Sequence, residues 1–234
     1  MSLRFKVIIV LYSLFANNVI AQKKVMTDCN TIFVCIDSIS YKQLFTNLFI
    51  KDTVFVCHET TTNTKDDQYT GKYAIGKSAT LEFFMPKPID KIGNHLYDFG
   101  IEFKTRQFGD LNLLIAKIDK RKTAIDTNTT QLNDLDTILP WYKTLLVAPS
   151  NPHFELSILE YQKEYLNYLG FDKKEILSPM TYEYYNQKIS NGKKYPRQFN
   201  KIKSVTIQIN KSQIEGLKYF CLLNEMKQKA NTFY

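Results

Sequence analysis

The order of hydrophobic patterns in the first third of the chain constrains its fold more than any other feature. Residues 30–37 are apolar and β-branched, as in a strand. From Tyr41 onward, apolar residues recur at the spacing of one helix face, with Ser38 or Ser40 as the expected N-cap. Strand character then returns in three segments, at 53–60, 69–76 and 79–85. The sequence therefore predicts a β, α, β, β, β unit.

A comparable succession follows Pro86 and Pro88, which block further strand pairing. Its predicted elements are a helix at 111–118 and strands at 95–104, 123–130 and 139–148. The recurrence predicts an α+β protein built from two modules, which are residues 22–88 and residues 89–234.

The C-terminal part of the chain departs from this pattern. An aromatic-rich helix is predicted over 154–169 and ends at Gly170, a common helix stop. A strand is predicted at 204–210 and a terminal helix at 212–229. These elements extend the second module.

Two basic residues, an apolar run at 7–15 and a small residue at Ala21 are typical of a secretory signal peptide. We expect a signal peptide at 1–21, cleaved after Ala21, and a periplasmic or secreted protein. A retained anchor is disfavoured because Asn17 and Asn18 interrupt the apolar run. Later runs are too short to cross a bilayer, so we expect no stable membrane insertion after cleavage.

Composition excludes some classes of protein. With 44% hydrophobic and 14% aromatic residues, the chain has ample material for a core. Its 31 Lys and Arg against 23 Asp and Glu give a net charge of +8. The basic clusters near 117–122 and 193–203 are interrupted by acidic or turn residues and match no binding motif, so they indicate solvated faces. We expect no nucleic-acid partner, and the sequence does not indicate an oligomeric state.

The four cysteines lack the CxxC spacing of zinc or redox sites. Cys35 and Cys57 lie in apolar strand-like runs and are expected to be buried thiols. A disulfide between Cys29 and Cys221 is the alternative that export leaves open.

The βαβββ order, closing on Leu-Glu-Phe-Phe at 81–84, resembles a module of the vicinal oxygen chelate, or glyoxalase-like, superfamily. The segments 59–62 and 69–73 are similar to an uncharacterised family of exported proteins, chiefly from Bacteroidetes, that is regarded as glyoxalase-like. The resemblance implies paired βαβββ modules whose mixed sheet forms a cup, here with extra C-terminal helices. It also implies a divalent metal ion held by the first and last strands of each module.

Two metal ligands follow from this resemblance. Glu82 matches the carboxylate ligand in the last strand of the first module, and His95 matches the histidine that opens the second. The remaining positions depart from the pattern, because Asn30 or Thr31 occupies the first strand and 139–148 contains no carboxylate. A divalent metal is thus the only cofactor expected, in a degenerate site.

Glu82 and Glu59 are the candidate catalytic residues. A carboxylate on a concave, aromatic-lined face is partly desolvated, and the resulting rise in pKa suits it to proton transfer. The alternative is that both lie at solvated strand edges. The candidate ligand-binding residues are Tyr69, Tyr73, Phe83 and Tyr97.

These observations lead to three hypotheses. The first is an exported glyoxalase-like protein that binds a small organic ligand in a β cavity. The second is a metal-dependent lyase or isomerase that uses Glu82 and His95. The third is a cell-surface or protein interaction module that uses the aromatic helix predicted over 154–169 together with the basic tail. The motifs of α/β hydrolases, zinc proteases and nucleotide-binding loops are not present.

Overall fold

The computed structural model describes residues 24–119, 123–134, 137–151, 153–190, 198–229 and 232–233. The signal peptide expected at 1–21 lies outside these residues, as do parts of both basic clusters. Within the described ranges, none of the helices combines the length and the apolar character that a bilayer crossing requires.

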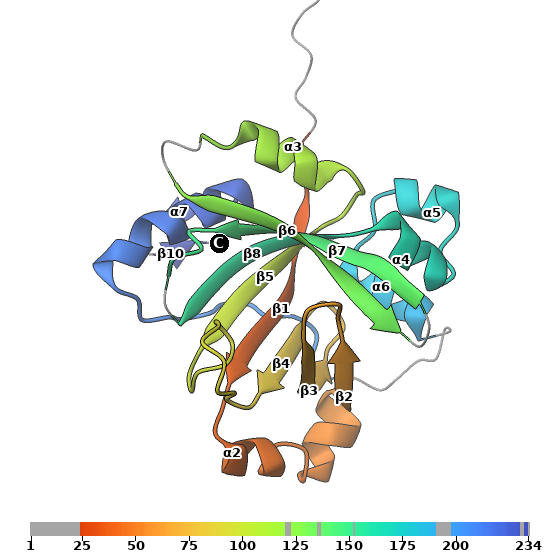
Figure 1. Ribbon diagram of the computed structural model, residues 1–234, viewed down its shortest axis with the longest axis vertical. Helices are drawn as coiled ribbons and strands as arrows, with labels where there is room; N and C mark the ends of the chain where they lie inside the picture. Colours follow the sequence, from red (N-terminus) through yellow and green to blue (C-terminus); the bar gives the residue numbers. More distant parts are fainter. Residues whose placement is uncertain are drawn as a thin grey trace, which may run out of the picture.

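Eight strands form one mixed sheet in the order β2-β3-β4-β1-β5-β8-β7-β6 (Figure 1). They are β1 (Thr27–Cys35), β2 (Val56–Asn63), β3 (Gln68–Ile75), β4 (Thr80–Phe84), β5 (Phe99–Thr105), β6 (Ile125–Asp134), β7 (Thr137–Val147) and β8 (Phe154–Tyr161). The α-helices are α2 (Ser38–Gln43), α3 (Asp110–Lys117), α4 (Lys163–Tyr168), α5 (Lys173–Leu177), α6 (Tyr182–Ile189) and α7 (Ile214–Leu223). Shorter elements are the π-helix Ile50–Val54, the 3-10 helix Lys211–Gln213 and a ribbon of β9 (Gln228–Lys229) and β10 (Thr232–Phe233).

The two halves of the sheet have the same connectivity. In the first half β1 pairs in parallel with β4, and in the second β5 pairs in parallel with β8. A parallel pair requires a crossover, and each half supplies one that contains a helix and two strands. The first strands, β1 and β5, pair antiparallel in the middle of the sheet. The fold is therefore α+β, with two βαβββ units side by side in one sheet.

The sheet curls into a half-barrel until its two edges touch. Thr64, after β2, forms an isolated bridge with Leu132 of β6, and the Lys65 amide donates to the Gln131 carbonyl at 3.0 Å. Because side chains alternate between the faces of a strand, this curl gives the sheet an inner and an outer face.

The main hydrophobic core lies on the outer face. Leu156 and Ile158 of β8 are fully buried there, under Leu111 of α3 and Phe220 of α7. Both helices cover this side of the second half in Figure 1. The core therefore fixes the sheet from outside and leaves the inner face for other side chains.

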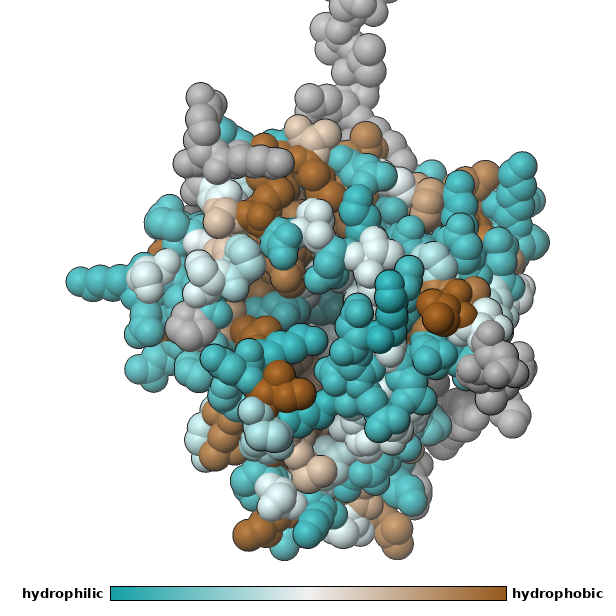
Figure 2. Space-filling view, in the orientation of Figure 1, coloured by the Kyte–Doolittle hydropathy of each residue, from teal (hydrophilic) through white to brown (hydrophobic). Residues whose placement is uncertain are grey.

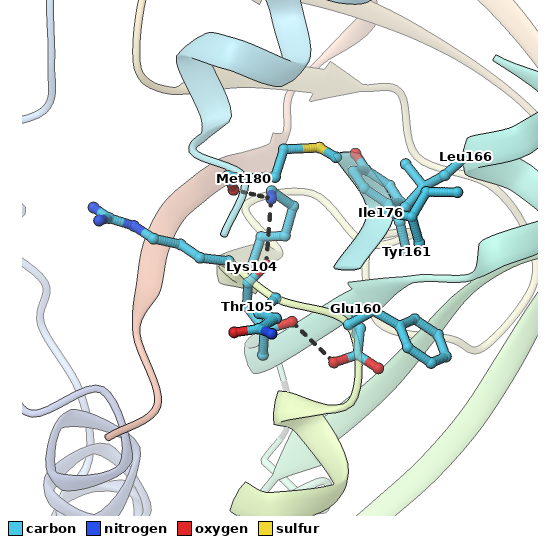
Figure 3. Close-up of a pocket in the computed structure, with 10 residues that line it drawn as sticks. Lys104, Thr105, Glu160, Tyr161, Leu166, Ile176 and Met180 are labelled. Carbon is cyan, nitrogen blue, oxygen red and sulfur yellow. Dashed lines mark hydrogen bonds between the residues drawn. The ribbon is translucent and has the colours of Figure 1, made fainter. Parts of the chain in front are cut away.

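Helices α4, α5 and α6 close one end of the half-barrel. The Tyr182 and Thr80 hydroxyl groups are hydrogen bonded, and Tyr161 stacks on Tyr185 with 4.8 Å between ring centroids. Lys104 donates to the Met180 carbonyl at 3.1 Å, as Figure 3 shows. Burial lowers the pKa of Lys104 to about 8.

The pocket drawn in Figure 3 has a volume of about 20 Å³, enough for a water molecule and too small for an organic ligand. It is lined by residues of this closed end, among them Lys104 and Tyr161. We interpret it as a packing gap in the structural cap.

The helix predicted over 154–169 is wrong in its first half. Residues 154–161 form β8, and only Lys163–Tyr168 are helical. Five consecutive residues of β8, 156 to 160, are buried. A strand covered on both faces loses the period-two alternation that reveals strands in sequence.

Other boundaries also differ from the prediction. The N-cap of α2 is Asp37, whose carboxylate accepts the amides of Ile39 and Ser40 at 2.9 Å, rather than Ser38 or Ser40. The predicted strand at 204–210 is wrong, because this segment has no strand pairing and packs Ile207 and Ile209 on the core.

Candidate functional site

Three glutamates from three strands share the inner face of the half-barrel. The register pairs Glu82 of β4 with Phe33 of β1, and Phe33 with Gly100 of β5. Gly100 in turn pairs with Glu155 of β8, and Glu102 is the next residue of β5 on the same face. All three glutamates are half-buried, so solvent still reaches their side chains. Figure 2 shows a recess near the centre of the face in view, bordered by both hydrophilic and hydrophobic residues.

Tyrosines line the same face. Tyr73 of β3 pairs with Glu82, and Tyr69 lies four residues earlier on the same side. Tyr142 of β7 pairs with Tyr161, which shares its face with Glu155. Burial raises the pKa of Tyr69, and the nearby Tyr142 raises it further. Since β3 and β7 belong to opposite halves, this interaction indicates that the tyrosines approach each other across the hollow.

Asn30 and Thr31 position two of the glutamates. The Asn30 amide nitrogen donates to Oε1 of Glu102 at 2.7 Å and to Oγ1 of Thr31 at 3.1 Å. The Thr31 hydroxyl donates to Oε1 of Glu82 at 3.4 Å. Asn30 can reach these groups because a β-bulge interrupts the register between Cys29 and Thr31, and bulges redirect side chains.

The electrostatics of the hollow favour protonated carboxyl groups. Burial raises the pKa of Glu82 to about 7. Burial, followed by the charge of Glu82, raises the pKa of Glu102 to about 8. Burial also raises the pKa of Glu155, and the nearby Ser157 side chain and the charge of Lys91 oppose this rise. Among the salt bridges of the described residues, none includes these three glutamates. The cluster can therefore hold a proton or accept a positively charged group.

Two of the residues predicted for the site lie on the other face. Glu59 pairs with Lys72, which pairs with Phe83, so both Glu59 and Phe83 point to the outer face. There the Tyr41 hydroxyl of α2 donates to Oε1 of Glu59 at 3.0 Å. The expectation that Glu59 and Phe83 line the cavity with Glu82 is wrong, whereas Tyr69, Tyr73 and Glu82 do lie on the inner face.

Tyr97 and His95 lie in the turn before β5 rather than within the strand that was predicted to start at residue 95. Tyr97 has a φ of 70° and is 72% exposed, so it does not line the hollow. His95 is grouped with Asp98 and His153 rather than with Glu82, and the Glu82–His95 metal pair stays a prediction.

The three residues His95, Asp98 and His153 can hold a metal ion, because one ligand atom from each lies within 4.8 Å of the others. Nδ1 of His95 is 3.1 Å from Oδ2 of Asp98, and Nδ1 of His153 is 2.6 Å from Oδ1. Burial opposes ionisation of Asp98. Hydrogen bonds from the His95 amide, the His153 ring, the Gly93 amide and the His95 ring outweigh it and lower the pKa of Asp98.

Sequence reasoning did not identify Glu102, Glu155, Tyr142, Asp98 or His153 as site residues. Glu102 lies two residues after Gly100 on β5 and therefore shares its face. Only the strand register shows that this is also the face of Glu82 and Glu155. Glu155 fell within the wrongly predicted helix, so its strand position had no sequence signal. Asp98 and His153 are 55 residues apart, and no local pattern joins them.

The cysteines are thiols. All four belong to described residues, and none forms a disulfide, so the alternative of a Cys29–Cys221 bridge is wrong. Cys35 is buried, as predicted, and Cys57 is half-buried. Burial raises the pKa of Cys35 to about 11. Cys35 and Cys221, which are buried, therefore contribute to packing.

Comparisons with known proteins place the chain in a single family. The model of a family of unknown function matches residues 29–232, which include every strand of the half-barrel from Cys29 onward. A search of curated proteins finds no match.

Proposed function

The chain belongs to this family, DUF5829, and we propose that it binds a small, positively charged organic ligand in the hollow of its half-barrel. The observation that carries the proposal is that Glu82, Glu102 and Glu155 share the inner face and form no salt bridge among the described residues. An enclosed group of carboxylates attracts cations, because a bound positive charge relieves both their mutual repulsion and their desolvation.

The tyrosines support a ligand that is organic. Tyr69 and Tyr73 flank Phe84, with ring centroids 5.8 and 6.3 Å from that ring. Aromatic faces attract organic cations, and hydroxyl groups at the ring tips fix orientation. A pocket with apolar walls and a few polar groups is the usual composition of a small-molecule site.

The glyoxalase-like kinship is part of the same proposal, and the paired βαβββ units of one curled sheet support it. In that superfamily a metal ion sits on the first and last strands of each module. Here the inner faces of those strands, β1, β4, β5 and β8, carry Thr31, Glu82, Glu102 and Glu155.

These inner residues do not fit a tightly held metal ion. Among described residues, the one set of three His, Cys, Asp or Glu ligands that converges is His95, Asp98 and His153, and no inner glutamate belongs to it. We therefore propose an organic ligand, rather than a metal, as the occupant of the hollow.

A second candidate function is proton transfer to or from the bound ligand, as in a lyase or isomerase. The pKa of Glu82 is about 7 and that of Glu102 about 8, so the two carboxyl groups hold a proton that they can exchange near neutral pH. A general acid or base works best when its pKa lies near the working pH.

The hypothesis of an interaction module loses one of its two supports, the aromatic helix, because residues 154–161 form a largely buried strand. We retain export as part of the proposal, supported by the sequence at 1–21.

Thermal unfolding of the purified protein with a panel of amines and matched acids tests the proposal. Cadaverine and glutarate are a suitable pair, because both have a five-carbon chain. Cadaverine carries a positive charge at each end, whereas glutarate carries a negative charge at each end. We expect the amines that fit to raise the Tm by about 5 °C at saturating concentration, and glutarate to leave it unchanged. Glu102→Gln should abolish this shift.

The matched control is Glu59→Gln, which removes a carboxylate from the outer face and should retain the shift. A larger stabilisation by the acids than by the amines, no stabilisation by any amine, or an equal loss in both variants would contradict the proposed site.

A further inference from the structure

A second site lies at the end of the half-barrel opposite the α4–α6 cap. Asp98 immediately precedes β5, and His153 immediately precedes the parallel strand β8. The opposite end of β5 carries Lys104, which contacts the cap. His95 reaches Asp98 from the β4–β5 loop, and Figure 1 shows that loop beside the starts of β5 and β8.

The buried member of this site is a rigidly held carboxylate. The Asp98 side chain has no exposed surface, and its Oδ2 accepts the Gly93 amide at 2.8 Å and the His95 amide at 2.9 Å. The imidazole rings of His95 and His153 are 40% and 63% exposed. The two rings, unlike the carboxylate between them, are therefore open to solvent.

His95 has a carboxylate at each of its ring nitrogens. Nε2 is 3.2 Å from Oδ1 of Asp90, and Nδ1 is 3.1 Å from Oδ2 of Asp98. An outer carboxylate on the far nitrogen is the usual partner of a metal-bound histidine, because it fixes the tautomer and the ring.

The backbone around the site is held in uncommon conformations. Tyr97 and His153 have φ values of 70° and 65°, in the left-handed region that side chains disfavour. The two rings meet nearly perpendicular, at 85°, with centroids 5.5 Å apart. Such conformations persist where surrounding contacts hold the backbone in place. Here they position both imidazole rings within hydrogen-bond distance of the Asp98 carboxylate.

We propose that His95, Asp98 and His153 bind a divalent transition metal ion of the zinc class. Two imidazoles and one carboxylate are ligands that favour Zn²⁺ and its neighbours over Mg²⁺ or Ca²⁺, which prefer all-oxygen sites. Three protein ligands leave a coordination position for water or another molecule. The ion would join the β4–β5 loop to the β7–β8 turn. This site includes none of the inner glutamates.

Zinc titration of the full chain by calorimetry tests this proposal, with Co²⁺ absorption as a report on coordination. We expect one ion per chain with a micromolar or lower Kd. Both His95→Ala and His153→Ala should weaken binding by at least about 100-fold. His58→Ala on β2 is the matched control, because it removes an exposed histidine elsewhere and should leave the Kd unchanged.

Asp98→Asn is a less suitable variant, because Asp98 organises the loop and its loss can prevent folding. Circular dichroism of the histidine variants verifies that they fold. Absence of zinc binding, unchanged binding in both histidine variants, or binding lost in Glu82→Gln would overturn the proposal. Cadaverine stabilisation should survive in His153→Ala, so failure of this site and failure of the hollow are distinguishable.

Discussion

The side chain of Asn30 donates a hydrogen bond of 2.7 Å to Oε1 of Glu102 on the neighbouring strand. Asn30 is 5% exposed, and its own Oδ1 has no hydrogen-bond partner among the described residues. A buried amide oxygen without a partner costs free energy, and such atoms are uncommon in folded proteins. Asn30 therefore fixes Glu102 in the hollow and still offers an acceptor to a ligand that carries a hydrogen-bond donor.

Replacing Asn30 with Ala should destabilise the protein more at pH 9 than at pH 6. The pKa of Glu102 is about 8, so at pH 9 its carboxylate is charged and loses its amide donor in the variant. Hydrogen bonds to charged groups contribute about 1.5 to 3 kcal/mol, against roughly 1 kcal/mol for neutral groups. Urea unfolding at both pH values measures the difference.

Asn63→Ala is the control for that measurement, since Asn63 is an exposed residue of β2. Its cost should not depend on pH. An equal cost of Asn30→Ala at both pH values would show that Glu102 remains protonated throughout, or that Asn30 acts only by packing.

The wild-type protein should lose stability as the pH rises from about 4.5 to about 8. Glu82 and Glu102 have folded pKa values of about 7 and about 8, above the ordinary value of 4.5. Below pH 4.5 both the folded and the unfolded chain are protonated, so the shift has no effect. Between pH 4.5 and pH 8 the two glutamates release their protons in the unfolded chain before they do so in the folded chain, which favours unfolding. Above pH 8 their contribution to the free energy of unfolding is constant.

Glu82→Gln should flatten this pH profile and stabilise the protein at pH 8 by on the order of 2 kcal/mol, a figure reduced for the solvent that reaches the side chain. Guanidinium unfolding across the pH range measures it, with Glu59→Gln as the outer-face control. A profile that is equally steep in Glu82→Gln would contradict the assigned rise in pKa. Stability gained by removing a charged group is typical of residues kept for function.

Gly100→Ala should destabilise the sheet by about 1 to 3 kcal/mol, because overpacking an ordered site forces its neighbours to move. A Cβ atom at Gly100 would overlap the ring of Phe33, which lies across β5 on the inner face. Phe33→Leu should relieve part of the cost, and a double-mutant cycle of unfolding free energies measures the coupling. Additive effects would indicate that the ring moves aside freely.

The first module was largely predictable from the sequence, because its strands are short β-branched and apolar segments separated by turn residues. β3 and β4 have the expected bounds within a residue or two, and the Gly76 amide donates to the Ala79 carbonyl in the predicted hairpin. β8 was not predictable, because it is covered on both faces and its buried residues include the polar Ser157 and Glu160, so polar and apolar residues do not alternate along it. The Glu and Leu residues of β8, and Gln162 after it, are also good helix formers.

The candidate site was predictable only in part, for a related reason. Alternation indicates which residues share a face, but it does not indicate which face is the hollow when both are covered. Glu59 is exposed on the outer face, where Tyr41 of α2 donates a hydrogen bond to it, but in sequence Glu59 and Glu82 were equally plausible. Asp98 and His153 meet because β5 and β8 start side by side, a tertiary relationship that requires the whole sheet order.

Alkylation of the protein purified without reductant should add four groups per chain in denaturant, because none of the four cysteines is in a disulfide. In the native state Cys29 and Cys221 should react slowly. Burial raises the pKa of Cys29 to about 12 and that of Cys221 to about 11, so at pH 8 only about one Cys221 thiol in a thousand is the reactive thiolate. Mass spectrometry counts the added groups, and Cys221→Ser should reduce the denatured count by one. A count of two in the wild type would mean that a disulfide joins two of the cysteines, which would contradict the thiol state found here.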